Sequence, residues 1–476
     1  MQKKIVLDLI NDEAPLFIEG VSLLFQQKIL EKDFVLGIVE GDRWEQEAKG
    51  LSSINRLHFF DDLDTKGINT SLELERISKQ YDNFNIYACD RYLTQKNRKY
   101  QEKILVYTYL FYEEVFSKNV SHYFTTGIAF TYNLISYQVA KKYGVKNISF
   151  YGTRIGNRTA ISLDTDNTFN EVLEAYDNFE PELVKEEMYT PLLDFLNNPE
   201  QPVYMTNVIN SSNLKFIFIK EFFIRFKKYY FSNKHKYDLF TKNPFVLARF
   251  RLNKIITAKK VNIVHNSIFD QVDYRDKYVV FPLHMQPEAS TLIMSPFDVN
   301  QQNAVINISK LIPPNMKLYV KEHRSALGQH SKKFYKELKK HPNIKLISYR
   351  ENMFDLIKNS LGTICLSSTA GLESLILKKP SITLGKVFYN NTGLTFNTES
   401  YYELKKIIKL VSNPDFNVED YFENYYERLA FYLHCLKEKS YPFEFNVAKL
   451  DTKNRVLNSH NVEKFSECVK KILKKQ

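Results

Sequence analysis

The chain contains 476 residues, which is too long for one ordinary globular core and fits two domains. Apolar residues make up 44% and charged residues 25%, a globular composition that excludes a largely disordered chain. The formal net charge is +11, but 13 Lys/Arg and only two acids fall within residues 214–260, and the remainder holds 53 basic and 53 acidic residues. Because the excess is local, a generally basic protein that coats nucleic acid is disfavoured.

Apolar strand patterns alternate with helical periodicity along the first third of the chain. The predicted strands are residues 3–10, 34–39, 85–89, 121–124 and 146–151, and the predicted helices are residues 21–30, 102–116 and 130–143. Gly144 follows the last of these helices as its expected C-cap. Such alternation predicts a parallel sheet with crossover helices.

An acidic helical stretch at residues 170–196 precedes the basic segment, and the alternation resumes after residue 260. The predicted strands there are residues 278–282, 317–321, 343–348, 363–366 and 381–384, and the helices are residues 301–311, 331–340, 353–360 and 371–377. The fold class is therefore α/β, with two doubly wound Rossmann-type domains facing a cleft. Ligands of such sheets bind outside the carboxyl ends of the strands, and the cleft is the default site.

The expected domains follow from this pattern. They are an N-terminal Rossmann-like domain (residues 1–165), a helical, basic and aromatic insertion (166–261), a C-terminal Rossmann-like domain (262–400) and C-terminal helices (401–476). The four cysteines are widely spaced and form no CxxC pair, which favours a reducing cytoplasm over a disulfide framework or zinc site. The N-terminal apolar run is too short for a signal peptide, and no stretch approaches the roughly 18 apolar residues of a membrane span.

The strongest candidate site is residues 366–373 (LSSTAGLE), between a predicted strand and a predicted helix. Ser367, Ser368 and Thr369 would add hydroxyl donors to free backbone N–H groups, a combination that favours phosphate. Glu373, one turn into the helix, could accept hydrogen bonds from ribose hydroxyls. The alternative is a plain helix N-cap with Glu373 as a capping-box acid.

Two further candidates end strands of the same predicted sheet. In residues 320–324 (VKEHR), Lys321 could neutralise a phosphate and His323 could donate to it, although a structural histidine at a solvated strand end is the alternative. In residues 281–291 (FPLHMQPEAST), the side chains of His284, Gln286, Glu288 and Ser290 would line the site. That last pattern is weak because proline-bounded loops are common.

Candidates in the N-terminal half also follow predicted strands. Arg91, Arg154 and Arg158 could grip an anionic acceptor or a donor carboxylate. A general base for a sugar hydroxyl would be a carboxylate or histidine near the cleft, with Glu19 as the first choice and Asp90 as the second. A cap or a solvated helix face is the alternative for each of these acids.

The three C-terminal motifs, in this order and spacing, resemble the bacterial capsule polysaccharide synthesis family, which is similar to Kdo transferases and related GT-B surface-carbohydrate glycosyltransferases. The matching stretches are residues 281–291, 318–324 (LYVKEHR) and 364–389 (ICLSSTAGLESLILKKPSITLGKVFY). The resemblance implies a GT-B-like fold in which residues 262–400 bind a nucleotide-sugar. It does not extend to acceptor or base assignments in the N-terminal half, where residues 1–165 are expected to form the acceptor domain. On this resemblance, His323 and the turn Ser367, Ser368 and Thr369 would hold the phosphate, and Glu373 would hold the ribose. The other expected donor-site residues, chosen for their positions after predicted strands, are His284, Gln286, Glu288, Lys321 and Arg324. The family usually has His-Pro where this chain has His323-Arg324, and Arg324 would add a phosphate contact.

The expected function is a glycosyltransferase that moves a sugar from a nucleotide-sugar, CMP-Kdo or another, to a growing lipid-linked capsule or lipopolysaccharide-type glycan. The alternatives are a teichoic-acid-type transferase that uses a CDP-polyol, and a non-catalytic glycan-assembly or membrane adaptor. No cofactor and no metal are expected, because a helix N-terminus, a lysine and a histidine can stabilise a departing nucleotide phosphate. The acidic run Asp61-Asp62-Leu63-Asp64 is assigned to a surface turn rather than to a metal site.

The basic segment at residues 214–260 interleaves Lys and Arg with Phe, Tyr, Ile and Leu. This composition suits a surface that lies on anionic lipid, where each basic residue contributes about 1 kcal/mol. We therefore expect a cytoplasmic protein at the inner face of the cell membrane. A solvated helical hairpin with inward-packed aromatics is the alternative, and nucleic-acid binding is disfavoured because the rest of the chain shows no matching fold.

Overall fold

The computed structural model describes residues 3–40, 48, 51, 53–57, 67–81, 90–91, 93–166, 168–199, 215–231, 243–445 and 456–474. The predicted strand at residues 85–89 and the acidic run at residues 61–64 lie outside these ranges. The chain divides into two compact units, each formed by more than one stretch of sequence. Unit 1 comprises Met1–Val172, Phe223–Asn243 and Leu436–Gln476, and unit 2 comprises Leu173–Phe222 and Pro244–Cys435.

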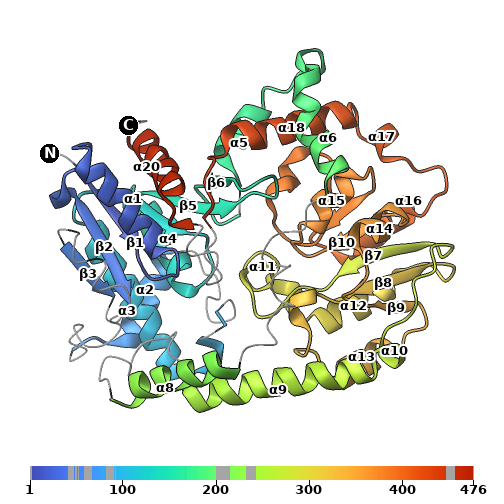
Figure 1. Cartoon of the computed structure of the whole chain (residues 1–476), viewed down its shortest axis with the longest axis horizontal. Helices are drawn as coiled ribbons and strands as arrows, with labels where there is room; N and C mark the ends of the chain where they lie inside the picture. The colour runs from blue at the N-terminus through green and yellow to red at the C-terminus, as the bar shows by residue number, and fades with distance from the viewer. Residues whose placement is uncertain are drawn as a thin grey trace. The chain divides into compact units, whose positions relative to one another are not determined.

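Unit 1 is built on a six-stranded sheet in the order β3-β2-β1-β4-β5-β6 (Figure 1). The strands are β1 (Lys4–Asp8), β2 (Val35–Glu40), β3 (Ser53–Leu57), β4 (Val120–Thr126), β5 (Lys146–Gly152) and β6 (Thr159–Ser162). All neighbours are parallel except β5 and β6. The main helices are α1 (Ala14–Gln26), α2 (Thr70–Gln80), α3 (Arg98–Phe116), α4 (Thr131–Lys142) and α20 (Ser459–Lys474). Every residue of β4 is buried, as expected for a central parallel strand covered on both faces.

Unit 2 is built on a second six-stranded sheet, parallel throughout, in the order β12-β11-β10-β7-β8-β9. The strands are β7 (Tyr278–Pro282), β8 (Lys317–Lys321), β9 (Ile344–Ile347), β10 (Thr363–Cys365), β11 (Ser381–Thr383) and β12 (Phe396–Asn397). The main helices are α9 (Pro244–Ile263), α12 (Gln301–Ser309), α13 (Lys332–Leu338), α14 (Met353–Lys358), α15 (Ala370–Ile376) and α16 (Tyr401–Val411), with the short α11 (Ala289–Leu292) after β7.

Both sheets have the same doubly wound order. Numbered from its own first strand, each reads 3-2-1-4-5-6, which is the Rossmann order. The predicted α/β fold class with two Rossmann-type domains is therefore confirmed. The strand order reverses between β1 and β4 in unit 1 and between β7 and β10 in unit 2, and ligands of doubly wound sheets bind at this switch point.

The unit boundaries differ from the expected domain boundaries because the chain returns to unit 1 at its C-terminal end. Helix α20 lies beside α1 (Figure 1), and a Cβ added to Gly20 would lie 2.3 Å from the Phe465 ring. The hydroxyl of Ser466 donates to the Gly20 carbonyl at 2.8 Å. The expected C-terminal helical region at residues 401–476 is thus shared, since α16 packs in the core of unit 2 and α20 in that of unit 1.

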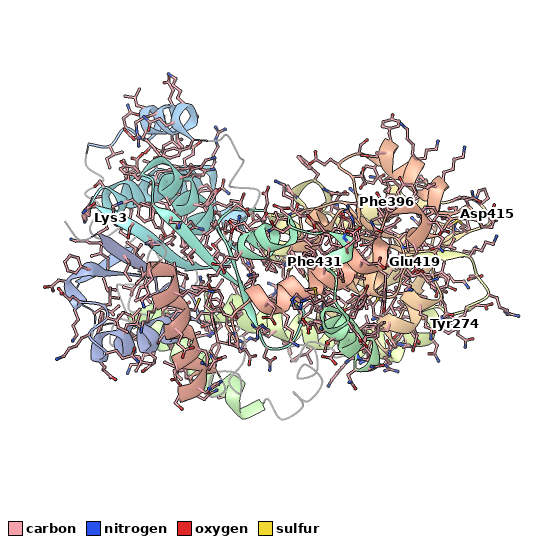
Figure 2. All side chains as sticks on the ribbon, turned by 90° about the horizontal axis from the view of Figure 1, so that it is seen from above. Lys3, Tyr274, Phe396, Asp415, Glu419 and Phe431 are labelled. Carbon is pink, nitrogen blue, oxygen red and sulfur yellow. The ribbon has the colours of Figure 1, made fainter. Side chains whose placement is uncertain are left out.

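The expected insertion at residues 166–261 is likewise not a separate body. The acidic stretch is broken into α5 (Asn170–Tyr176), two short 3-10 turns and α6 (Thr190–Asn197). The residues of α8 (Lys215–Phe231) are divided, those up to Phe222 belonging to unit 2 and those from Phe223 to unit 1. Tyr176 and Phe179 pack against Phe431 of α18 (Tyr425–Lys439), a residue labelled in Figure 2. Val261 of α9 is fully buried in the core of unit 2. Among the described residues, every helix falls short of the combination of length and hydropathy that a membrane span requires.

Candidate functional site

The three predicted motifs of unit 2 follow three adjacent strands at its switch point. Strand β7 lies between β10 and β8 (Figure 1), and the three strands are parallel. Their carboxyl ends therefore meet at one edge of the sheet, which brings together His284 after β7, Lys321 and His323 at the end of β8, and residues 367–369 after β10. This is the edge where doubly wound sheets bind ligands.

The loops after β7 and β10 are joined by a direct hydrogen bond. The hydroxyl of Ser367 donates to the carbonyl of Ser290 at 2.6 Å. This hydrogen bond uses the hydroxyl proton and links the two loops. The Ser368 hydroxyl accepts from the backbone N–H of Ala370 at 3.2 Å. Thr369 is the N-cap residue of α15 but makes no side-chain capping bond. Glu373 is buried within α15, and its charge acts on Lys321.

His284 has its backbone fixed while one side-chain atom has no partner. Gln301, the first residue of α12, accepts from the His284 N–H at 2.6 Å and donates to its carbonyl at 3.0 Å. The His284 side chain is buried, and its Nε2 atom has no hydrogen-bond partner. Burial lowers the pKa of His284 to about 4, and the nearby charge of His323 contributes. A buried polar atom left unpaired costs about 1–3 kcal/mol, so a ligand that satisfies Nε2 would recover this cost.

His323 has the opposite arrangement, because its inner ring nitrogen is used. The backbone N–H of Ser325 donates to Nδ1 of His323 at 3.1 Å, so the neutral ring carries its proton on Nε2 and can donate from there. The His323 N–H donates to Oε1 of Glu322 at 2.8 Å. The other carboxylate oxygen of Glu322 accepts from Tyr335 at 2.6 Å and from His330 at 2.9 Å. Glu322 therefore anchors the loop after β8.

Lys321 supplies a positive charge without a paired carboxylate. Burial lowers the pKa of Lys321 to about 8, and the charge of Arg324 adds to this effect. Glu322, Glu351 and Glu373 partly oppose it, but no described acid forms an ion pair with the Lys321 ammonium group. A buried cation is costly without a counter-charge, so this edge of the sheet favours an anionic ligand.

Two further predicted residues of the loop after β7, Gln286 and Glu288, make contacts within this part of the chain. The side-chain amide of Gln286 donates to the carbonyl of Val299 at 2.5 Å. The Ser290 hydroxyl lies 3.5 Å from the Glu288 carboxylate, and Glu288 is the N-cap residue of α11. The peptide bond between Gln286 and Pro287 is cis.

One cation near this edge was missed from the sequence. Lys254 lies on α9, and its ammonium group donates to the carbonyl of Ser325 at 3.1 Å. It is one of 13 basic residues in the 214–260 segment, and nothing in its spacing distinguishes it from the others.

At the corresponding edge of unit 1, Asp8 is held by a network of hydrogen bonds. Asp8 ends β1 and is fully buried, and its Oδ2 atom accepts from Thr125 at 2.7 Å, Tyr123 at 3.0 Å and Asn133 at 3.2 Å. Its Oδ1 atom accepts from the backbone N–H of Ile10 at 3.1 Å. Burial nevertheless raises the pKa of Asp8. Satisfied on both oxygens, Asp8 stabilises the switch point of unit 1.

The predicted acids and arginines of unit 1 occupy varied environments. Glu19 is exposed on α1. Asp90 is buried and accepts from the backbone N–H groups of Leu93 and Thr131, both at 2.9 Å, so it caps α4, as in the alternative considered above.

Arg91 and Arg158 each make contacts within unit 1. The Arg91 guanidinium lies 4.8 Å from the centre of the Phe130 ring. Arg158 donates from Nε to the Ser440 hydroxyl at 2.9 Å and also binds the Ser440 carbonyl. Burial lowers its pKa. Arg154 lies in the turn after β5. No group of three or more metal-ligating side chains occurs within the described ranges.

Comparison with known proteins gives a match over the middle of the chain. Residues 209–418 match the family model described as capsule polysaccharide biosynthesis protein, and this range contains all three motifs. The resemblance to the capsule polysaccharide synthesis family is confirmed for this part of the chain. Protein FixF of Sinorhizobium fredii (strain NBRC 101917 / NGR234) is 29% identical over 149 residues, which cover 30% of this chain and 35% of that protein. The match thus spans about a third of that relative.

Two solved structures are similar at low sequence identity. The beta Kdo 2,4 transferase KpsC of Thermosulfurimonas dismutans is 13% identical with a TM-score of 0.34, and the match covers 66% of this chain and 79% of that one. The UDP-GlcNAc 2-epimerase of Methanocaldococcus jannaschii, in complex with UDP-GlcNAc and UDP, is 13% identical with a TM-score of 0.30, and the match covers 90% of this chain and 97% of that one.

Proposed function

We propose that this chain is a glycosyltransferase of capsule or lipopolysaccharide-type glycan synthesis that binds a nucleotide-sugar at the switch point of unit 2. The observation that carries the proposal is the buried, unpartnered Nε2 atom of His284 beside His323 and the unpaired cation of Lys321. Hydrogen-bond capacity and positive charge at one strand edge fit the diphosphate or monophosphate of a nucleotide donor. The family match over the same residues supports this ligand class.

The arrangement suggests how the leaving group would be stabilised. His323 can donate from Nε2 to a phosphate oxygen, and Lys321 can offset the negative charge that develops as the sugar–oxygen bond breaks. Glu373, buried on α15, is the proposed ribose partner, and Arg324 a further phosphate contact. No metal or cofactor is proposed. For the base that deprotonates the acceptor hydroxyl we retain Glu19 ahead of Asp90, because both carboxylate oxygens of Asp90 accept backbone N–H groups.

The test is a thermal-shift panel with CMP, CDP and UDP on the full chain. Wild-type protein should be stabilised by at least one nucleotide, and His323→Ala should lose most of that stabilisation. His460→Ala is the matched control, because His460 is exposed on α20 of unit 1 and should leave the shift unchanged. No stabilisation by any nucleotide, or equal stabilisation of wild type and His323→Ala, would contradict the proposal.

The two alternatives differ in measurable ways. Turnover of a CDP-polyol, with no turnover of CMP-Kdo or other nucleotide-sugars, would identify the teichoic-acid-type transferase. A chain that binds no nucleotide but still supports glycan assembly in cells would be an adaptor.

We also propose that α9 binds an anionic membrane surface, where a lipid-linked acceptor would be presented to a peripheral protein at the inner face of the membrane. The helix contains five Lys/Arg and no acid. Its side chains include several exposed apolar residues, which are Phe245, Val246, Phe250, Leu252, Ile255, Ile256 and Ile263. Exposed apolar side chains interleaved with cations suit anionic lipid, since apolar contact and charge attraction act together.

Co-sedimentation with vesicles tests this surface. Binding to vesicles of phosphatidylglycerol and phosphatidylcholine should be strong at low salt, weaker at high salt, and reduced by Arg249→Glu/Lys259→Glu. Absence of binding to these vesicles at low salt would contradict the membrane proposal, and retention by single-stranded RNA instead would favour nucleic acid.

A further inference from the structure

Lys254 contacts the loop of His323 although it precedes the whole sheet of unit 2 in the chain. Its ammonium group donates to the carbonyl of Ser325 at 3.1 Å. The N–H of the same Ser325 donates to Nδ1 of His323 at 3.1 Å. Ser325 is therefore held on one side by Lys254 and on the other by the imidazole of His323. Substitution of Lys254 would therefore affect the position of the His323 ring through one intervening residue, Ser325.

The loop also lies directly against the backbone of α9. Gly328 has a φ of +84°, and a Cβ added there would lie 2.3 Å from the Lys254 carbonyl oxygen and 3.0 Å from the Ala258 Cβ. Only a residue without a side chain allows this approach. Val261, two turns after Lys254, is fully buried in the core of unit 2. Helix α9 therefore packs directly against the loop after β8 rather than serving only as a connection.

Lys254 affects the His323 ring through its charge, in addition to its hydrogen bond with Ser325. Burial lowers the pKa of His323, and the charges of Lys321, His330 and Lys254 lower it further while Glu322 raises it. Burial also lowers the pKa of Lys254 itself. No described acid forms an ion pair with Lys254, so Lys254 and Lys321 are two cations without a paired carboxylate, and both act on His323. A bound anion would compensate both charges.

We infer that Lys254 is a positioning residue of the anion site, which holds the Ser325 peptide so that His323 presents a donating Nε2–H group to a ligand phosphate. The phosphate ligand rests on the proposed function, whereas the positioning of His323 does not. Of the α9 cations, Lys254 therefore serves the site, whereas Arg249 and Lys259 are exposed on the same helix.

The experiment compares Lys254→Met, Lys254→Arg and the control Lys259→Met, an exposed lysine of the same helix, in the full chain. The readout is the His323 imidazole pKa, measured by NMR of histidine-labelled protein and assigned with His323→Gln. Lys254→Met should raise this pKa, because a repelling cation is removed, while Lys254→Arg and Lys259→Met should leave it near the wild-type value. Lys254→Met should also weaken CMP binding about tenfold, as expected for loss of a charge-assisted hydrogen bond.

The outcomes separate the two proposals. An unchanged His323 pKa in Lys254→Met would overturn the inference, as would a rise of equal size in Lys259→Met. If Lys254→Met raises the His323 pKa but wild type binds no nucleotide, the positioning role is kept and the proposed function is rejected. Should Lys254→Met fail to fold, Lys254→Gln removes the charge while keeping a donor, and it must raise the His323 pKa for the inference to stand.

Discussion

His323 lies close enough to His284 for its charge to disfavour protonation of the His284 ring, although the two residues follow different strands. The relationship arises because β7 and β8 are parallel neighbours and end at the same edge. The pKa values of both histidines and of Lys321 are lowered. An anion that binds at this edge should therefore raise these pKa values and favour the protonated forms.

The first prediction separates stability from ligand binding at His284. Replacing His284 by leucine removes the buried unpartnered nitrogen, so the free energy of unfolding should stay constant or rise by about 1–3 kcal/mol. Stabilisation by CMP should be lost in the same variant. Urea unfolding with and without CMP measures both, and His122→Leu, a change at a buried histidine of unit 1, should leave CMP stabilisation intact. Loss of stability with retained CMP stabilisation would mean that His284 is structural.

The second prediction concerns acid sensitivity. The folded pKa of His284 is about 4, below its ordinary value of 6.5, so the unfolded chain binds more protons between these two values. Stability therefore rises with pH through this window and is lost as the pH falls from 6.5 towards 4, by at most about 3 kcal/mol from this residue. Because His284→Leu is expected to be at least as stable as wild type at pH 7, the unfolding free energies of the two proteins, measured from pH 7 to pH 4, should diverge as the pH falls. Parallel curves would contradict the buried neutral state of His284.

The third prediction follows from Lys321. Its pKa of about 8 should rise when a phosphate neutralises its surroundings, so nucleotide binding above pH 8 should be accompanied by proton uptake. Calorimetric titration with CMP at pH 8.5, in two buffers of different ionisation enthalpy, measures that uptake. Lys321→Arg keeps the charge but cannot titrate in this range, and proton uptake should disappear. Equal uptake in the variant would assign the proton to another group.

The fourth prediction tests the close packing beneath the 367–369 turn. A Cβ added to Gly371 would lie 2.1 Å from the Tyr389 hydroxyl and 2.8 Å from that of Ser381. Gly371→Ala should therefore destabilise the protein by about 1–3 kcal/mol, because a packed core absorbs extra volume poorly. Chemical denaturation measures the loss, and Tyr389→Phe in the same chain should recover part of it by removing the hydroxyl. An unchanged midpoint would show that the helix shifts without strain.

The alternation of strands and helices was predictable from the sequence because parallel strands buried on both faces give continuous apolar runs. Strand β8 was predicted with its observed bounds, and β7 likewise. The gathering of His284, Lys321 and His323 was also predictable, since residues that follow neighbouring parallel strands share an edge. The antiparallel β6 was missed because its pairing with β5 depends on tertiary contacts rather than on its own pattern.

The roles of residues whose partners are distant in the sequence could not be predicted. Asp90 caps α4 through the N–H group of Thr131, which no local pattern reveals, and Glu322 anchors its loop through Tyr335 and His330. The return of α20 to unit 1 depends on Gly20 making room for Phe465. Composition located the cations of residues 214–260 but could not separate Lys254 from the rest, because only the fold shows which cation faces Ser325.

The attachment of α9 to unit 2 determines which piece of this protein can be exchanged between related chains. A chimaera joined at residue 262, where the sequence pattern alone would put the boundary, would separate the buried Val261 and the Lys254–Ser325 contact from the sheet that they support. A junction placed ahead of Pro244 would transfer α9 together with Gly328, whose missing side chain is matched to this helix. A folded chimaera should therefore be obtained only when helix and sheet are inherited together.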